Sequence, residues 1–385
     1  LLDEKDQILG DTYGYRDHRT DGMDAEVAKI LPETELYGKT GIQKQIFNTV
    51  YQLMAVKQQT PELLQQAKTL LMLPDYFGFR LTGNKLSEYT NGSTTQLVNP
   101  DTFQWDKELI RKLGYPEDIF LPLQMPGTKV GQLLPEIQEE VGFDLEVVLC
   151  GSHDTASAVM AVPQTEGDGI YISSGTWSLM GIESLKPVIT EDAAAANFTN
   201  EGGYDHRFRF LKNIMGLWMI QSVRHEYNDA YSFAQLCDMA EESKEFPSRV
   251  DVNDQSFLSP DSMVEAIRQY CHKTGQPVPE SVGELTSVVY RSLAQSYGET
   301  VRGLEKIAGK TYDSIHIIGG GSNAAYLNQL TADATGKTVY AGPGEATAIG
   351  NLLAQMIHAG DLADLKSARK CVRESFEIKT FAPAK

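Results

Sequence analysis

The strongest constraint on the fold lies in the last third of the chain, where a strand, a glycine-rich turn and a helix follow one another twice. Residues 313–336, DSIHIIGGGSNAAYLNQLTADATG, predict the first series, and residues 337–360, KTVYAGPGEATAIGNLLAQMIHAG, predict the second. Ahead of them the spacing of apolar residues predicts a long amphipathic helix, with one face formed by Leu285, Val289, Leu293, Val301, Leu304 and Ile307. Helices that alternate with strands in this way indicate an α/β fold with a parallel sheet.

Three consecutive glycines, Gly319, Gly320 and Gly321, are expected at the carboxyl end of a strand and directly before a helix. A loop without side chains lets the backbone approach a nucleotide closely, and the amino-terminal end of the helix favours an anion. The spacing matches neither the Walker loop nor the dinucleotide-binding fingerprint. A plain tight turn would use the same glycines, so this loop alone identifies no ligand.

A second feature is the carboxylate of Asp154, which stands where the strand-like segment LEVVLC gives way to the helix-like segment TASAVMAV. Asp154 could simply cap the first turn of that helix. It could also carry chemistry, since open α/β sheets place ligands at the carboxyl ends of their strands. The segment GSHDTASAV alone slightly favours the cap, for which Ser152 and Thr155 are alternative residues.

Residues 169–183, GIYISSGTWSLMGIE, predict two strands joined by a tight hairpin at Ser174, Gly175 and Thr176. The amides and hydroxyls of such a turn could bind phosphate oxygens. An ordinary hairpin is the simpler interpretation of this segment on its own.

The first third of the chain gives weaker patterns. Residues 1–15 predict a strand, a turn and a second strand. Further on, Thr90 or Asn91 is expected to cap a short helix that stops at Pro100. Between them, residues 42–56 predict a helix whose apolar face comprises Ile46, Val50, Leu53 and Met54.

Length and composition indicate the number of domains and exclude some classes of function. A chain of 385 residues predicts two domains, with three as the alternative. We place the boundary in the segment VPQTEGDG, where proline, glycine and charge cluster. The net charge of −18 argues against a nucleic-acid partner or an anionic membrane. No apolar run is long enough to cross a bilayer, and four widely spaced cysteines indicate free thiols in a reducing cytoplasm.

Several segments together resemble a known family. SHDTASAV, YISSGTWSLMG, ITEDAAAANFTNEGG, LKNIMGLWMIQ and IIGGGSNAAYLNQLTADATG, preceded by GYRDHRT and EYTNGSTTQLVN, resemble the FGGY family of carbohydrate kinases. Within it, LKNIMGLWMIQ after TNEGG is similar to the members that act on L-rhamnulose. The resemblance covers almost the whole chain, in order.

The resemblance implies an α/β fold with two actin-like, ribonuclease H-like ATPase domains and the active site in the cleft between them. Residues 1–165 would form the first, sugar-binding domain, and residues 166–385 the second, nucleotide-binding domain. The implied activity is the ATP-dependent phosphorylation of L-rhamnulose to L-rhamnulose 1-phosphate in rhamnose catabolism. ATP and Mg²⁺ are the implied cofactors, with the metal bridging ATP phosphates largely through water and substrate oxygens.

The same resemblance implies roles for individual residues. Asp154 corresponds to the catalytic base, which makes a mere cap the less favoured role for it. The implied sugar-binding residues are His153, Thr155 and Asn213. The implied ATP-binding residues are Thr176, Gln221, Gly320 and Gly321.

The chain departs from the family pattern at both ends. The family begins with a hairpin that contains Asp-Gly and a basic residue and helps to hold ATP phosphates, whereas this chain begins at Leu1 without it. It also stops soon after FEIKTFAPAK, somewhat before the family usually ends. We therefore expect a first domain that lacks its amino-terminal part, with weak ATP binding and poor phosphate transfer.

Other functions remain compatible with these patterns. The chain could be a kinase for another ketose or polyol, such as L-fuculose or D-xylulose. It could be a non-kinase ATPase of the actin or heat-shock chaperone type, since fold does not fix function. It could also be a sugar sensor without catalysis, although Asp154 argues against that interpretation because a sensor needs no base. The sequence leaves the oligomeric state open.

Overall fold

The computed structural model describes residues 1–15, 17–164 and 168–384, which fold into two compact units. Unit 1 comprises Leu1–Ser157, Glu183–Phe210 and Gly350–Ala363, and unit 2 comprises Ala158–Ile182, Leu211–Ile349 and Asp364–Lys385. The domain boundary that the sequence predicts between residues 165 and 166 lies outside the described residues. The assignment of residues 1–165 and 166–385 to two domains therefore stays a prediction.

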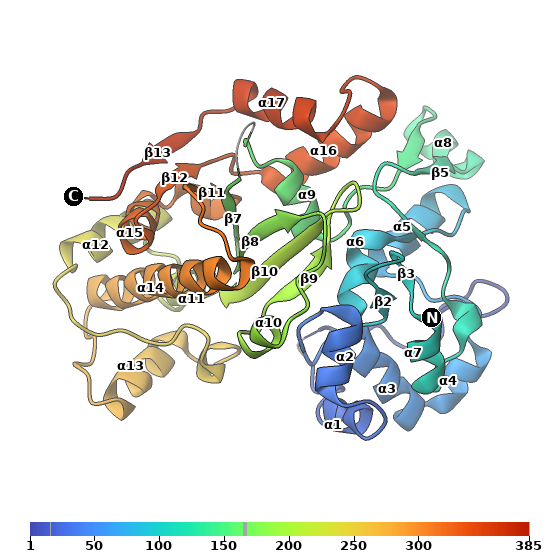
Figure 1. Ribbon diagram of the computed structural model, residues 1–385, viewed down its shortest axis with the longest axis horizontal. Helices are drawn as coiled ribbons and strands as arrows, with labels where there is room; N and C mark the ends of the chain where they lie inside the picture. Colours follow the sequence, from blue (N-terminus) through green and yellow to red (C-terminus); the bar gives the residue numbers. More distant parts are fainter. Residues whose placement is uncertain (16, 165–167, 385) are drawn as a thin grey trace. The chain divides into compact units, whose positions relative to one another are not determined.

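A seven-stranded sheet has the strand order β13-β12-β11-β7-β8-β10-β9 (Figure 1). Strand β11 pairs in parallel with β12, as the repeated strand–glycine–helix series predicts, and also in parallel with β7, which the series does not predict. Strand β8 pairs antiparallel with β7, and β13 pairs antiparallel with β12, so the sheet is mixed. The bounds are β7 Ile170–Ser174, β8 Trp177–Ser184, β9 Thr199–Gly202, β10 Phe208–Met215, β11 Ser314–Ile318, β12 Thr338–Ala341 and β13 Lys379–Phe381.

Helix α14 (Val282–Ala308) is the long amphipathic helix that the sequence predicts, and it packs against α15 (Ala325–Thr335). It begins with a capping box in which the side chains of Ser281 and Glu284 each accept the other's backbone N–H. It ends at Gly309, whose φ of 63° lies in the left-handed region that glycine adopts readily. Five of the six predicted residues are buried: Leu285, Val289, Leu293, Val301 and Leu304.

In unit 1, helix α3 (Thr49–Gln59) contributes to a hydrophobic core. It buries three of the four predicted residues, Val50, Leu53 and Met54. The fourth assignment is wrong, because Ile46 lies in a turn before the helix and its side chain is 40% exposed. The helix begins only after Asn48, which has extended backbone.

The strand, turn and second strand predicted in residues 1–15 are reduced to one antiparallel bridge across a turn. Leu2 and Ile8 form a single isolated antiparallel bridge, and the segment between them is turn and loop. The backbone N–H of Leu2 bonds to the carbonyl of Thr69 at 2.8 Å. Two further backbone bonds, from Asp3 N–H to the Gln7 carbonyl at 3.0 Å and from Leu9 N–H to the Leu1 carbonyl at 2.9 Å, close a minimal hairpin. Its first arm therefore bonds both to its own second arm and to Thr69.

The cap predicted at Thr90 or Asn91 is also wrong. Glu88 is the N-cap of helix α6 (Tyr89–Gly92), and its carboxylate accepts the backbone N–H groups of Thr90 and Asn91. The helix is short and passes into the 3₁₀ turn η1 (Ser93–Thr95), well before Pro100.

The remaining elements complete the two units. The helices are α1 Met23–Ala28, α2 Glu33–Thr40, α4 Pro61–Gln66, α5 Leu73–Thr82, α7 Lys107–Lys112, α8 Pro135–Val141, α9 Asp154–Met160, α10 Glu191–Ala195, α11 Trp218–Glu226, α12 Phe233–Glu242, α13 Met263–Lys273, α16 Ala346–Ala359 and α17 Leu365–Ser375, with the 3₁₀ turns η2 Glu117–Ile119, η3 Gln255–Phe257 and η4 Gly320–Asn323. The short strands, paired β1 with β4, β2 with β3 and β5 with β6, are β1 Ser87–Glu88, β2 Val98–Asn99, β3 Gln104–Trp105, β4 Leu123–Gln124, β5 Lys129–Gln132 and β6 Glu146–Val148.

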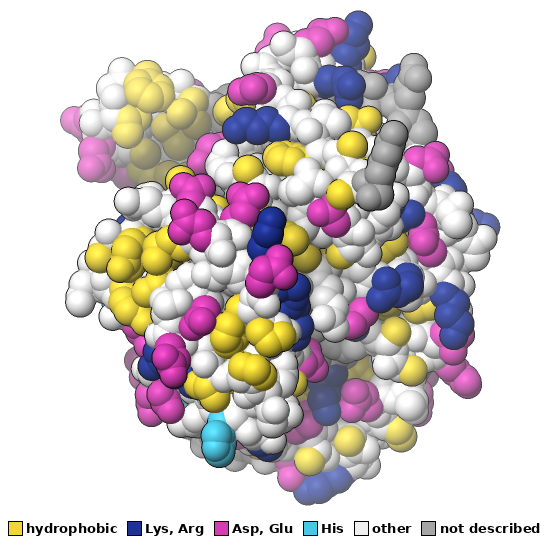
Figure 2. Space-filling view, turned by 90° about the vertical axis from the view of Figure 1, so that its left-hand side faces the viewer, with side chains coloured by type: hydrophobic (Ala, Val, Ile, Leu, Met, Phe, Trp, Pro, Cys, Tyr) yellow, Lys and Arg dark blue, Asp and Glu magenta, His cyan; other side chains and the backbone are white. Residues whose placement is uncertain are grey.

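Acidic and basic side chains are interspersed on the face shown in Figure 2, where the basic ones form no continuous area. Among the described residues, no helix is both long and apolar enough to span a membrane. All four cysteines are free thiols, as their spacing predicts.

Candidate active site

Asp154 is the first residue of helix α9 in unit 1, at the junction that the sequence singles out. Its Oδ1 accepts the backbone N–H of Thr155 at 2.6 Å and the Thr155 hydroxyl at 3.2 Å. The Thr155 side chain is buried, whereas the Asp154 side chain is 79% exposed. The structure therefore orients the carboxylate through its neighbour and leaves it accessible to a ligand.

The two residues considered as alternative caps of this helix, Ser152 and Thr155, both bond to carboxylates through their hydroxyls. The hydroxyl of Ser152 donates to the carboxylate of Glu88 at 2.5 Å, and the hydroxyl of Thr155 donates to Asp154. Both hydroxyls therefore serve carboxylates rather than free amides of the first helical turn.

His153 lies beside Asp154, with its Nδ1 3.4 Å from the Asp154 Oδ1. Its Nε2 lies 3.7 Å from Oε2 of Glu201, and the guanidinium of Arg209 lies 3.1 Å from that same oxygen. Burial, followed by the positive charge of Arg209, lowers the pKa of His153. The imidazole is therefore neutral at neutral pH and carries a single N–H.

The buried pair of Glu201 and Arg209 belongs to the segment around TNEGG. The Nε of Arg209 donates to the carbonyl of Gly202 at 2.9 Å, and the amide of Gly202 donates to the hydroxyl of Ser93 at 2.8 Å. A Cβ on Gly202 would overlap the ring of Tyr89. Glycine is required at this position because the strand approaches that ring so closely.

The small residues after Asp154 contribute to packing. Ala156 and Ser157 are buried, and a Cβ on Gly350 of helix α16 would overlap the Ser157 carbonyl. The small side chains thus allow α16 to approach α9 closely.

In unit 2, the predicted hairpin at Ser174, Gly175 and Thr176 is confirmed, because β7 and β8 pair antiparallel across it. Thr176 is exposed at its tip. The carbonyls of Gly175 and Thr176 accept the N–H groups of Leu217 and Trp218 at 3.0 and 3.1 Å. These bonds join the turn to the start of helix α11, on which Gln221 is half-buried.

The glycine loop lies against the same hairpin. A Cβ on Gly319, where φ is 82°, would lie 2.9 Å from the carbonyl oxygen of Ser174, and a Cβ on Gly321 would overlap the Ser174 hydroxyl. Gly320 is exposed, and a Cβ there would meet no atom within 4 Å. Two glycines are thus needed for packing, and the middle one faces open space.

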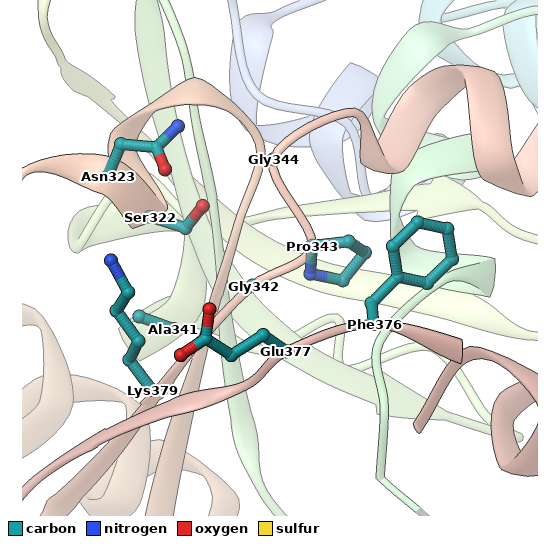
Figure 3. Close-up of a pocket in the computed structure, with 9 residues that line it drawn as sticks. All are labelled: Ser322, Asn323, Ala341, Gly342, Pro343, Gly344, Phe376, Glu377 and Lys379. Carbon is teal, nitrogen blue, oxygen red and sulfur yellow. The ribbon is translucent and has the colours of Figure 1, made fainter. Parts of the chain in front are cut away.

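A pocket of about 160 Å³ adjoins this loop in unit 2 (Figure 3). In Figure 3 the ammonium end of Lys379 points toward Ser322 and Asn323, and Phe376 lies beyond Pro343. The lining residues are Ser322, Asn323, Ala341, Gly342, Pro343, Gly344, Phe376, Glu377 and Lys379. The sequence did not predict that Phe376, Glu377 and Lys379, which lie before and within β13, line this pocket.

Two models of one family match the chain. The N-terminal domain of the FGGY family of carbohydrate kinases matches residues 1–161, and the C-terminal domain of that family matches residues 170–359. The chain belongs to the FGGY family of carbohydrate kinases. The resemblance found in the sequence is therefore confirmed, and the protein is a carbohydrate kinase.

The relatives of this FGGY kinase agree in their names. A rhamnulokinase of Halalkalibacterium halodurans is 52% identical over 100% of the chain and 82% of its own length. A rhamnulokinase of Oceanobacillus iheyensis is 50% identical over 99% of the chain and 81% of its own length. Among solved structures, ligand-bound xylulose kinase from Lactobacillus acidophilus has a TM-score of 0.78 at 16% identity, covering 100% of the chain and 77% of that protein. The predicted two-domain, actin-like α/β fold is thereby confirmed.

The structure brings some of the predicted residues of this FGGY kinase together. Asp154, His153 and Thr155 are in contact in unit 1. In unit 2, the turn that carries Thr176 contacts both the glycine loop and the start of α11. Asn213 lies half-buried on β10. Its contact with the sugar stays a prediction, as do the roles of the other residues.

Three residues that surround Ser152 and His153 were missed in the sequence: Glu88, Glu201 and Arg209. Arg209 is a charged residue inside the apolar strand FRFLKNIM, which is a signal that a buried partner is needed. Glu201 lies in the TNEGG motif, which contributed to the sequence analysis only as part of the family pattern. Glu88 gave no local signal, because its main partner, Ser152, is 64 residues away.

Proposed function

We propose that the protein transfers the γ-phosphoryl group of ATP to the primary hydroxyl of L-rhamnulose and releases L-rhamnulose 1-phosphate and ADP. The observation that carries the proposal is the exposed Asp154 carboxylate, held by Thr155 beside a neutral imidazole. The names of the relatives, at about half identity over nearly the whole chain, support the choice of sugar.

The reaction needs a proton acceptor next to the sugar hydroxyl. In phosphoryl transfer the transition state is loose, so an enzyme mainly positions the reactants and neutralises charge. As the sugar oxygen bonds to phosphorus and the bond to the ADP oxygen breaks, the hydroxyl proton passes to Asp154. A carboxylate suffices for this role because the proton leaves late, when the oxygen has already begun to bond.

His153 and Thr155 would orient the sugar and the base in unit 1, and Asn213 would contribute a sugar contact from β10. His153 suits a neutral hydroxyl ligand, since a neutral imidazole offers one donor and one acceptor. Thr155 acts through Asp154, because its own side chain is buried.

The nucleotide would be held by unit 2. The exposed Thr176 hydroxyl and the turn around it would contact ATP phosphate. Gly320 and Gly321 would lie along the adenosine, since a ligand can approach the open side of Gly320. Gln221 would contribute a further contact from α11, and the neighbouring pocket would accept part of the adenosine.

Mg²⁺ would enter as part of the MgATP substrate and would neutralise charge on its phosphates. Among the described residues, no group of three or more His, Cys, Asp or Glu side chains is arranged to hold a metal ion. Mg²⁺ usually keeps several waters and binds substrate phosphates with few protein ligands. We also infer a cytoplasmic location, supported by the four free thiols; cell fractionation tests it.

The test is a coupled assay of ADP release with MgATP and L-rhamnulose, L-fuculose, D-xylulose or no sugar. We expect the highest kcat/KM with L-rhamnulose and little turnover without sugar. A higher kcat/KM for D-xylulose would overturn the proposed substrate. Equal turnover with and without sugar would overturn the proposed transfer to a sugar.

A further inference from the structure

We propose that Glu88 is a positioning residue that fixes the loop carrying His153 and Asp154, an inference that rests on the proposed role of Asp154. Glu88 is fully buried at the end of β1, where it caps helix α6. The sequence and the family resemblance gave it no role.

The carboxylate of Glu88 is bonded directly to the loop. Its Oε2 accepts the backbone N–H of Ser152 at 3.1 Å and the Ser152 hydroxyl at 2.5 Å. Ser152 is two residues before Asp154. One buried oxygen therefore holds both the backbone and the side chain of the residue that leads into the proposed site.

A second connection passes through Thr90. The Thr90 hydroxyl donates to Oε2 of Glu88 at 2.6 Å and accepts the backbone N–H of His153 at 3.2 Å. The remaining bonds to Glu88 come from the amides of Thr90, at 2.6 Å, and Asn91, at 3.1 Å. Two consecutive backbone amides of the loop, those of Ser152 and His153, are thus fixed by Glu88 and Thr90.

A helix cap alone does not account for this arrangement. A neutral serine or threonine caps a helix well, whereas burying a carboxylate is unfavourable unless its oxygens are hydrogen-bonded. Serine and threonine are also too short to contact both the first turn of α6 and Ser152. The carboxylate reaches both, so the bonds to the loop distinguish positioning from capping.

The expected consequence is a loss of alignment at Asp154. Displacing a reacting group by about 1 Å can reduce a rate roughly a hundredfold. Glu88→Gln keeps the shape but places an NH₂ group against backbone or hydroxyl donors, so at least one bond to the loop or to α6 is lost. We expect kcat to fall roughly 10- to 100-fold. KM for ATP should stay unchanged, because the residues proposed to bind ATP belong to unit 2.

The matched control is Asp75→Asn. Asp75 is a second buried carboxylate, and its Oδ1 accepts the backbone N–H of Glu88 at 3.1 Å. The amide in Asp75→Asn retains that acceptor, and in an assay at pH 8, above the pKa of about 7 that burial gives Asp75, the substitution removes a buried charge. We expect kcat within about twofold of the wild type. That result would show that removing a buried charge near Glu88 does not by itself lower kcat.

The decisive measurement combines Glu88→Gln with Asp154→Asn. If Glu88 acts through Asp154, adding Glu88→Gln to Asp154→Asn leaves the residual kcat unchanged. A merely structural role would lower that residual kcat by the same factor as in the wild type, and this result would overturn the inference. Near-normal kcat in folded Glu88→Gln alone would also overturn it.

Thr90 provides a test that does not depend on the folding of Glu88→Gln. Thr90→Val removes the hydroxyl that bridges Glu88 to His153 and keeps the shape, and Thr90→Ser restores a hydroxyl. We expect kcat to fall in Thr90→Val and to recover in Thr90→Ser, with KM for ATP constant. Equal kcat in both variants would contradict the inference. A normal kcat in Asp154→Asn would show that the proposed base is wrong. A normal kcat in Thr90→Val together with an inactive Asp154→Asn would contradict only the proposed role of Glu88.

Discussion

The guanidinium of Arg209 lies 3.1 Å from the carboxylate of Glu201, and both side chains are buried next to His153. Arg209 is fully buried, so the positive charge depends on this partner for compensation. Positive charge from Arg209 and negative charge from Glu201 act oppositely on the pKa of His153, in which burial is the larger effect. The pair therefore contributes to local stability, and its two opposing charges modify a pKa of His153 that burial mainly lowers.

Removing one member of this pair should destabilise the fold more than removing both. We expect Glu201→Leu to lower the free energy of unfolding by about 3–5 kcal/mol, because it leaves a buried charge without a partner. The double change Glu201→Leu with Arg209→Met should recover most of that loss. Urea unfolding of the wild type and these two variants measures both differences. A double variant less stable than Glu201→Leu would contradict this account.

Asp154→Asn should separate catalysis from folding and nucleotide binding. The variant keeps the size of the side chain but cannot take the sugar proton, and loss of a general base typically reduces a rate about 10²- to 10⁴-fold. The Tm should change little, because the side chain is 79% exposed. Steady-state kinetics, thermal unfolding and ADP titration check the three expectations. A normal kcat would reassign Asp154 to helix capping.

The elements that could be predicted are those specified by nearby residues. Helix α14 can be predicted from its apolar period and its capping box. The series of β11, glycine loop and α15 can be predicted because a strand, three glycines and a helix follow one another within 23 residues, Ser314 to Gly336. The first strand-like segment was predicted less well, since Leu2 forms only isolated bridges, one with Ile8 and one with the distant Thr69. Strands need partners, and alternation does not identify them.

The site shows the same limit. Asp154 could be noted from the sequence because a carboxylate between a strand and a helix is a local feature. Its supports are distant: Glu88 bonds to Ser152 across 64 residues, and Glu201 approaches His153 across a comparable separation. Neither a hydrophobic period nor a turn motif indicates such contacts, because they form only when distant segments of unit 1 fold together.

Two of the three consecutive glycines, Gly320 and Gly321, provide a matched pair of substitutions. Gly321→Ala would place a Cβ against the Ser174 hydroxyl, so we expect a loss of stability of roughly 1–3 kcal/mol from overpacking. Gly320→Ala meets no atom within 4 Å and should keep the Tm of the wild type. If ATP approaches Gly320, the same variant should raise KM for ATP about tenfold, which corresponds to about 1.4 kcal/mol. An unchanged KM for ATP in Gly320→Ala would remove Gly320 from the nucleotide site.

The stability of the fold should depend on the ionisation of Asp75. Burial, and then the negative charge of Glu88, raise the pKa of Asp75 from 3.8 to about 7. Between these two values the folded chain binds a proton that the unfolded chain has lost, so this residue's contribution to stability falls as pH rises from about 4 to 7. Asp75→Asn cannot ionise and escapes that loss. We therefore expect the Tm of Asp75→Asn relative to the wild type to increase between pH 5 and pH 8, as measured by thermal unfolding at each pH. The exposed Asp101→Asn serves as the control and should show no such trend; a Tm difference for Asp75→Asn that is flat across this range would mean that Asp75 ionises normally in the folded protein.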